Sequence, residues 1–138
     1  MLKSDVIENK ISAIREYLDI LERYKQYSVE EITNNVDIRG AVERYLHLAT
    51  QATIDLAEAF ISAKNFRKPT TLSESFYILK DKDVINEELY RKLINMAGFR
   101  NVIVHDYRKI DYNLVHNILH KNLEDILEFS QIIQKLYG

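Results

Sequence analysis

Glycine occurs only three times and proline only once in this chain of 138 residues. Because these two residues are the strongest breakers of regular backbone structure, such sparse use favours long helices over short strands and turns. Apolar residues also recur at three- and four-residue spacing, which is typical of helices with one buried face. A first helix is predicted from about Asp5 to Tyr24. Its apolar stripe consists of Ile7, Ile11, Ile14, Leu18 and Leu21.

Side chains that cap helix N-termini mark where the next helices begin. Ser28 is followed three residues later by Glu31, and this is the spacing of a capping box. Thr71 and Glu74 repeat the pattern ahead of a short helix. Asn86 is a favourable N-cap for a further helix, because two acidic residues follow it in the first turn.

Breaks between these segments complete the expected architecture. The pair Asn34-Asn35 is expected to interrupt the second helical stretch, after which a long helix continues to about Lys64. The segment 65–69 is the clearest linker, since the residue before a proline resists helix. A last helix is predicted from about Asp111 to Leu136. The sequence therefore predicts a single all-α domain over residues 1–138, a bundle of four to five helices.

Composition excludes several classes of protein. The chain has no cysteine, which excludes disulfides and thiolate metal sites. No apolar run approaches the ~20 residues of a membrane span, and the N-terminal residues show no signal-peptide core, so the expected location is the cytoplasm. The net charge of -2 gives no global attraction to nucleic acid. Any contact with RNA would depend on a local basic patch.

The helix predicted after Asn86 carries two polar residues on its apolar line. That line runs through Leu89, Leu93, Met96, Arg100, Ile103 and Tyr107. An arginine in such a position is seldom buried without a partner, and its guanidinium is well shaped to hold a phosphate through two hydrogen bonds. In a straight helix His105 would point roughly 200° away from Tyr107. We therefore expect the helix to end or bend near Asp106 if the three side chains converge.

This segment resembles a known family signature. Residues 98–107 read GFRNVIVHDY, which is similar to the R-x4-H-x-Y motif of the HEPN superfamily, in particular its HepT toxin branch. Residues 39–46 (RGAVERYL) and 51–57 (QATIDLA) resemble the second-helix pattern of the same family. Helix order and length agree as well, so the resemblance covers nearly the whole chain.

The resemblance implies a function and a set of roles. HepT-like proteins are metal-independent RNases that need no cofactor and form homodimers with both motifs facing one cleft. Each is paired with a minimal nucleotidyltransferase antitoxin of the MntA type, which adds AMP to the motif tyrosine. Carried over to this chain, the resemblance makes Arg100 and His105 catalytic and Asn101 a supporting residue. It makes Tyr107 a supporting residue and the target of AMPylation.

The chemistry of these side chains is consistent with that role. Cleavage of RNA without a metal requires a base for the 2′-hydroxyl, a cation for the phosphorane and an acid for the leaving oxygen. His105 can exchange protons near neutral pH, and Arg100 can stabilise charge on phosphate oxygens. The motif supplies one histidine per chain, whereas cleavage needs both a base and an acid. This favours a symmetric dimer, in which two chains supply two histidines. Two alternatives stay open: a non-catalytic subunit that helps a nucleotidyltransferase present nucleotide or substrate, and an RNA-binding module without cleavage.

Other charged residues have simpler interpretations. His116 and His120 stand four residues apart on the last helix, a spacing that can hold zinc, but no further ligands complete a site. Four basic residues flank the motif and could guide RNA, although solvated positions are the commoner role of such residues. These are Arg91, Lys92, Arg108 and Lys109.

Overall fold

The computed structural model describes the backbone of residues 3–105 and 110–137, and the side chains of 5–99 and 110–137. Every regular element in these ranges is helical, which confirms the all-α prediction. The α-helices are α1 (Lys3–Glu22), α2 (Val29–Asn34), α3 (Val36–Ala63), α4 (Leu72–Asp81), α5 (Glu87–His105), α6 (Tyr112–Asn117) and α7 (Leu123–Tyr137). A 3₁₀ turn, Arg23–Gln26, follows α1, and a π turn, Ile118–Asn122, joins α6 to α7.

The predicted caps form as expected and define most of these boundaries. Ser28 accepts a hydrogen bond from the backbone of Glu31, whose carboxylate accepts one from the Ser28 amide. Thr71 caps α4, and Asn86 accepts a hydrogen bond of 2.8 Å from the amide of Leu89 at the start of α5. Each cap satisfies amides that a helix N-terminus would otherwise leave without a partner.

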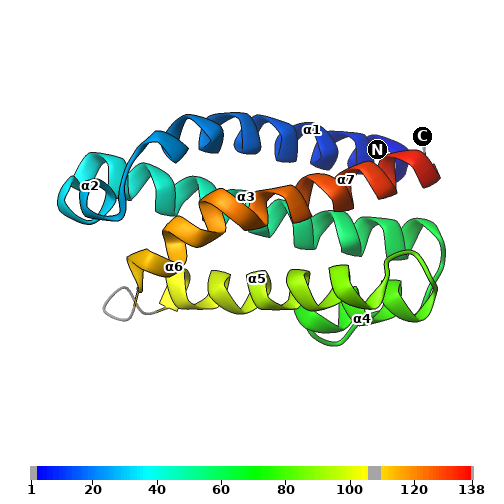
Figure 1. Ribbon diagram of the computed structural model, residues 1–138. Helices are drawn as coiled ribbons and strands as arrows, with labels where there is room; N and C mark the ends of the chain where they lie inside the picture. The colour runs from blue at the N-terminus through cyan, green and yellow to red at the C-terminus, as the bar shows by residue number, and fades with distance from the viewer. Residues whose placement is uncertain (1–2, 106–109, 138) are drawn as a thin grey trace.

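The longest helix, α3, lies in the middle of the bundle (Figure 1). It contacts α1 and α7 on one side and α4 and α5 on the other. The two ends of the described chain lie together at one end of the bundle, where α1 begins and α7 finishes (Figure 1). The opposite end holds α2, α6 and the C-terminal end of α5.

A continuous apolar core joins these helices. The stripe predicted on the first helix is buried, except that Leu18 is half-buried. Three phenylalanines on three different helices fill the interior, namely Phe60, Phe76 and Phe129. The rings of Phe76 and Phe129 meet edge to face with centroids 5.9 Å apart, which is a favoured geometry for aromatic pairs.

The count of helices and the form of the last helix differ from the prediction. Residues 3–105 and 110–137 contain seven α-helical segments rather than four or five, because α2 and α6 are separate pieces of six residues each. The expected last helix is interrupted by the π turn, whose wider backbone shifts the phase of the helix. None of the described helices has the length and apolarity required to cross a bilayer.

Candidate functional site

Three of the four candidate site residues lie on the last turns of one helix. Arg100, Asn101 and His105 belong to α5, and His105 is its last described residue. Their side chains lie outside the described part of the structure. Tyr107 and the expected bend at Asp106 also lie outside it. The structure therefore places the backbone of the motif arginine and histidine, five residues apart, at the C-terminal end of α5.

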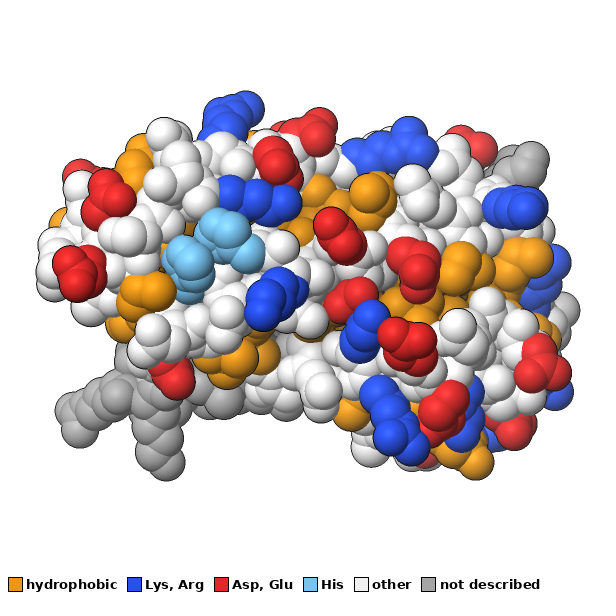
Figure 2. Space-filling model, in the orientation of Figure 1, with side chains coloured by type: hydrophobic (Ala, Val, Ile, Leu, Met, Phe, Trp, Pro, Cys, Tyr) orange, Lys and Arg blue, Asp and Glu red, His pale blue; other side chains and the backbone are white. Residues whose placement is uncertain are grey.

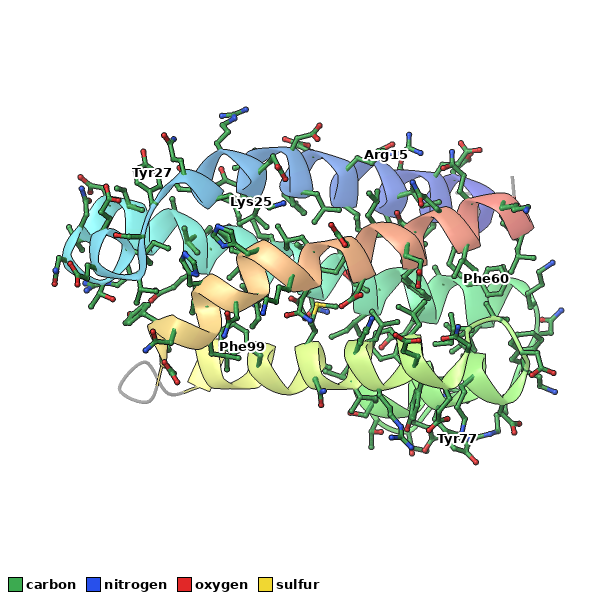
Figure 3. All side chains as sticks on the ribbon, in the orientation of Figure 1. Arg15, Lys25, Tyr27, Phe60, Tyr77 and Phe99 are labelled. Atoms are coloured by element: carbon green, nitrogen blue, oxygen red, sulfur yellow. The ribbon has the colours of Figure 1, made fainter. Side chains whose placement is uncertain are left out.

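The helix that carries the motif is anchored through its preceding turns. Leu89, Leu93 and Met96 are buried, as the predicted stripe requires. Phe99 is buried as well, on the side of α5 that faces the C-terminal helices (Figure 3). Position 100 is one turn beyond Met96 on the same line. The packing of these residues fixes the helix immediately before Arg100.

A polar cluster links α3 to α6, the helix that follows the motif. The hydroxyl of Tyr112 donates a hydrogen bond of 2.7 Å to Oε1 of Glu43. The guanidinium of Arg39 lies 6.0 Å from the centroid of the Tyr112 ring, and its Nη1 donates a hydrogen bond of 2.9 Å to the carbonyl of Thr33. One turn of α3 thus holds both the last turn of α2 and the first residue of α6.

The environment of Tyr112 changes its acidity. Burial and the hydrogen bond to the Glu43 carboxylate raise the pKa of the Tyr112 hydroxyl to about 12, although Arg39 opposes this. Both main causes favour the neutral phenol over the phenolate. Tyr112 therefore remains a hydrogen-bond donor throughout the neutral and mildly alkaline range. Arg39 and Glu43 lie in the segment 39–46 that resembles the family pattern, but nothing in the sequence indicates that they meet Tyr112.

The two histidines of the last helix make contacts with each other and with the backbone. Their rings stack with centroids 4.1 Å apart. Figure 2 shows histidine side chains next to each other on one face of the molecule. Both ring nitrogens of His120 lie 2.9 Å from carbonyl oxygens, one of His116 and one of Lys25. Within the described ranges, no three His, Cys, Asp or Glu side chains converge to hold a metal ion. This pair therefore ties the π turn to the 3₁₀ turn after α1.

Two of the four basic residues expected near the motif are paired with acids. Arg91 contacts Glu87 at 2.9 Å, and this hydrogen bond is the main cause of the lowered pKa of Glu87. Lys92 lies 3.2 Å from Glu88 and 3.6 Å from the buried carboxylate of Asp125. Arg108 and Lys109 lie outside the described residues. Arg91 and Lys92 therefore each have an acidic partner, and neither stands as an unpaired positive charge that would attract RNA.

A surface pocket of about 580 Å³ lies far from the motif. It is formed by the end of α3 and the connection to α4, and Glu58 and Phe66 are among its lining residues. Burial, together with the neighbouring Asp55, raises the pKa of Glu58. This end of the bundle is opposite the C-terminal end of α5 (Figure 1). The candidate site is therefore identified by the sequence motif and not by the volume of a pocket.

Comparison with known proteins gives matches over most of the chain. A family model described as "Ribonuclease HepT-like" matches residues 14–133. The tRNA nuclease HepT of Aphanizomenon flos-aquae is 32% identical over 110 residues, which cover 80% of this chain and 75% of that protein. The mRNA nuclease HepT of Shewanella oneidensis is 26% identical over 132 residues, covering 95% of this chain and 98% of that protein.

A solved structure also shares the fold. It is that of a tri-AMPylated Shewanella oneidensis HEPN toxin in complex with MNT antitoxin. It aligns with a TM-score of 0.88 at 25% identity, covering 98% of this chain and 99% of the toxin chain. The helical arrangement described above is therefore the one found in that toxin.

Proposed function

The chain belongs to the HepT-like ribonuclease family, and we propose that it cleaves RNA with Arg100 and His105 as catalytic residues. It is an endoribonuclease of the kind that acts as the toxin of a toxin–antitoxin pair. The observation that carries the residue assignment is the R-x4-H-x-Y motif, whose arginine and histidine lie on the last turns of α5. A non-catalytic subunit and an RNA-binding module without cleavage are both disfavoured by membership of a ribonuclease family.

The proposed mechanism follows from the chemistry of the two side chains. His105 removes the proton of the RNA 2′-hydroxyl, and the resulting oxygen attacks the adjacent phosphorus. Arg100 stabilises the negative charge that builds on the phosphate oxygens, and Asn101 supports the site as a neighbouring polar group. A second imidazole protonates the 5′-oxygen as its bond to phosphorus breaks. A bond from the 2′-oxygen to phosphorus forms as the bond from phosphorus to the 5′-oxygen breaks. These changes require one base and one acid, and protein side chains can serve as both.

This mechanism should be insensitive to chelation. Purified protein incubated with RNA is expected to cleave at the same rate with and without excess EDTA, because the reaction relies on protein side chains. The measurement is the initial rate of cleavage of a labelled RNA in the two buffers. A rate that collapses in EDTA and returns with added divalent cation would contradict the mechanism.

We further propose that the protein is a homodimer in which the C-terminal ends of both α5 helices face one cleft. Each chain supplies one motif histidine, so two copies supply the base and the acid that cleavage requires.

The dimer can be tested by its mass. Light scattering at micromolar concentration is expected to report about twice the monomer mass of 16.3 kDa. A mass equal to that of the monomer would mean that each site contains only one motif histidine. The proposed mechanism would then lack a second imidazole to protonate the leaving oxygen.

The partner of this ribonuclease is proposed to be a minimal nucleotidyltransferase antitoxin that transfers AMP to Tyr107. Support comes from the aligned toxin, which is AMPylated and bound to an MNT antitoxin. The substrate is proposed to be cellular RNA, and the proposed location is the cytoplasm. tRNA and mRNA are the substrates named for the two curated relatives.

A further inference from the structure

Arg39 and Glu43 lie one turn apart on α3, and each holds a different segment at the motif end of the bundle. Arg39 holds the last turn of α2 through the carbonyl of Thr33, and Glu43 holds the first residue of α6 through the hydroxyl of Tyr112. Figure 1 shows α2, α6 and the C-terminal end of α5 at this same end. One turn of α3 therefore supports both α2 and α6 at this end of the bundle.

The bond between Glu43 and Tyr112 has the properties of a strong restraint. An O–H donor at 2.7 Å from a carboxylate is a charge-assisted hydrogen bond, and partial burial protects it from water. The Arg39 guanidinium over the ring adds a cation–π contact that holds the ring in place. The bond joins residues 69 positions apart in the chain. It is thus a tertiary restraint and not part of the helix geometry of α6.

The hydrogen bond anchors the first turn of a longer helical run. α6 has six residues and passes through the π turn directly into α7, and the first turn of such a run lacks part of its backbone hydrogen bonds. Asp111 caps this turn, the side chain of Val115 is buried, and α2 also contacts α6. Without the Tyr112 hydroxyl, the start of α6 would lose its polar connection to α3. α5 ends at His105, and α6 begins at Tyr112, seven positions later in the sequence.

We propose that Glu43 and Tyr112 are positioning residues for RNA cleavage, because their hydrogen bond fixes the start of α6 on α3 at the end of the bundle where α5 and its motif residues finish. The proposal rests on the assignment of Arg100 and His105 to catalysis. Neither Glu43 nor Tyr112 touches substrate in this scheme. Their effect is on orientation, and misplacement of a reacting group by about 1 Å can cost about a hundredfold in rate.

The test compares variants that remove the bond in two ways. Tyr112→Phe keeps the ring over Arg39 and loses only the hydroxyl, whereas Glu43→Ala removes the acceptor. Both are expected to lower kcat by about tenfold or more while KM for RNA changes less than about twofold, since substrate contacts are unchanged. The double variant should lose no more than the worse single variant, because the two share one interaction. Glu43→Gln should keep most of the rate, since its amide oxygen still accepts the phenol proton.

A matched control removes another link to α3 at a distance from the motif. Lys10 on α1 contacts Asp55 on α3 at 3.2 Å, and Asp55 lies about 18 Å along the helix from Glu43. Lys10→Gln is expected to cleave RNA at the wild-type rate at a temperature where all variants are folded. Equal losses in Lys10→Gln and Tyr112→Phe would show a general structural effect and overturn the proposal.

Failure of this proposal can be told apart from failure of the catalytic assignment. If His105→Ala is inactive while Tyr112→Phe and Glu43→Ala match the wild type, only the positioning role is overturned. If His105→Ala itself cleaves RNA at the wild-type rate, the assignment of the catalytic site is wrong. The positioning role of Glu43 and Tyr112 is then overturned as well.

The bond itself can be measured through the pH dependence of stability. Burial and then the hydrogen bond to Glu43 raise the pKa of Tyr112 from its ordinary value of 10.0 to about 12 in the folded protein, and Arg39 opposes this. A raised pKa means that the stabilisation is complete below pH 10 and is lost as pH rises toward 12. The difference in unfolding free energy between the wild type and Tyr112→Phe should shrink over that interval. A difference independent of pH would show that the bond does not form in solution and would overturn the proposal.

Discussion

Replacing His105 with alanine is expected to abolish RNA cleavage, lowering the rate by about a thousandfold or more. His105 is the motif residue able to exchange protons near neutral pH, and general acid–base catalysis contributes about 10²–10⁴-fold in enzymes. In the proposed dimer the substitution removes both the base and the acid, so the loss should lie in the upper part of that range. Alanine is the best helix former, so α5 should still form up to this position.

The measurement is the single-turnover rate of cleavage of a labelled RNA, together with growth of cells that express the variant. His116→Ala provides a matched control, because His116 lies on α6 and stacks on His120. It should cleave at close to the wild-type rate. Both variants should melt near the wild-type temperature. Cleavage by His105→Ala at the wild-type rate would contradict the proposed mechanism.

Transfer of AMP to Tyr107 is expected to inactivate the protein completely. Each AMP adds a phosphodiester with one negative charge and a bulky nucleoside. Tyr107 stands seven residues after Arg100 in the motif, so this charge is added close in sequence to the cation that should hold the substrate phosphate. Inhibition would then combine neutralisation of Arg100 with steric blockage, and no change of fold would be required.

Mass spectrometry of the protein coexpressed with a minimal nucleotidyltransferase antitoxin of the MNT type tests this switch. An increment of one or more AMP units should map to the peptide that contains Tyr107 and disappear in Tyr107→Phe. The phenylalanine variant keeps the ring and lacks only the acceptor oxygen, so it is the matched control. Increments on another residue, or modified protein that cuts as fast as unmodified protein, would contradict the switch and leave the ribonuclease assignment standing.

The helix boundaries were predictable because their causes are local. Ser28 and Asn86 cap helices through bonds that reach only three residues along the chain, and the sequence displays both partners. The break at Asn35 is equally local, since its side chain accepts hydrogen bonds from the amides of Asp37 and Ile38. Such signals need no knowledge of the tertiary structure.

The features that the sequence did not reveal depend on distant contacts. The π turn within the predicted last helix has no composition signal, because the same residues would suit an α-helix. The Tyr112–Glu43 bond joins positions 69 residues apart, and neither residue is unusual in its own helix. Only the packing of α6 against α3 brings them together.

The candidate site was predicted from its motif and not from its geometry. The structure places Arg100, Asn101 and His105 on α5, as the helical line through Met96 indicates. The role of Tyr107 remains a prediction, because this residue lies outside the described part of the chain. A family signature can be recognised without coordinates, since it depends on spacing alone.

The antiparallel course of the bundle has a practical consequence for engineering. α1 begins and α7 finishes at the same end, and α5 runs from that end toward the other for 19 residues, or about 28 Å (Figure 1). A fluorescent reporter or an affinity handle joined before Lys3 or after Tyr137 would therefore sit well clear of His105. The same proximity of the two ends suits circular permutation, because a short linker can bridge them while new ends are opened in the α3–α4 connection, which is also remote from the motif.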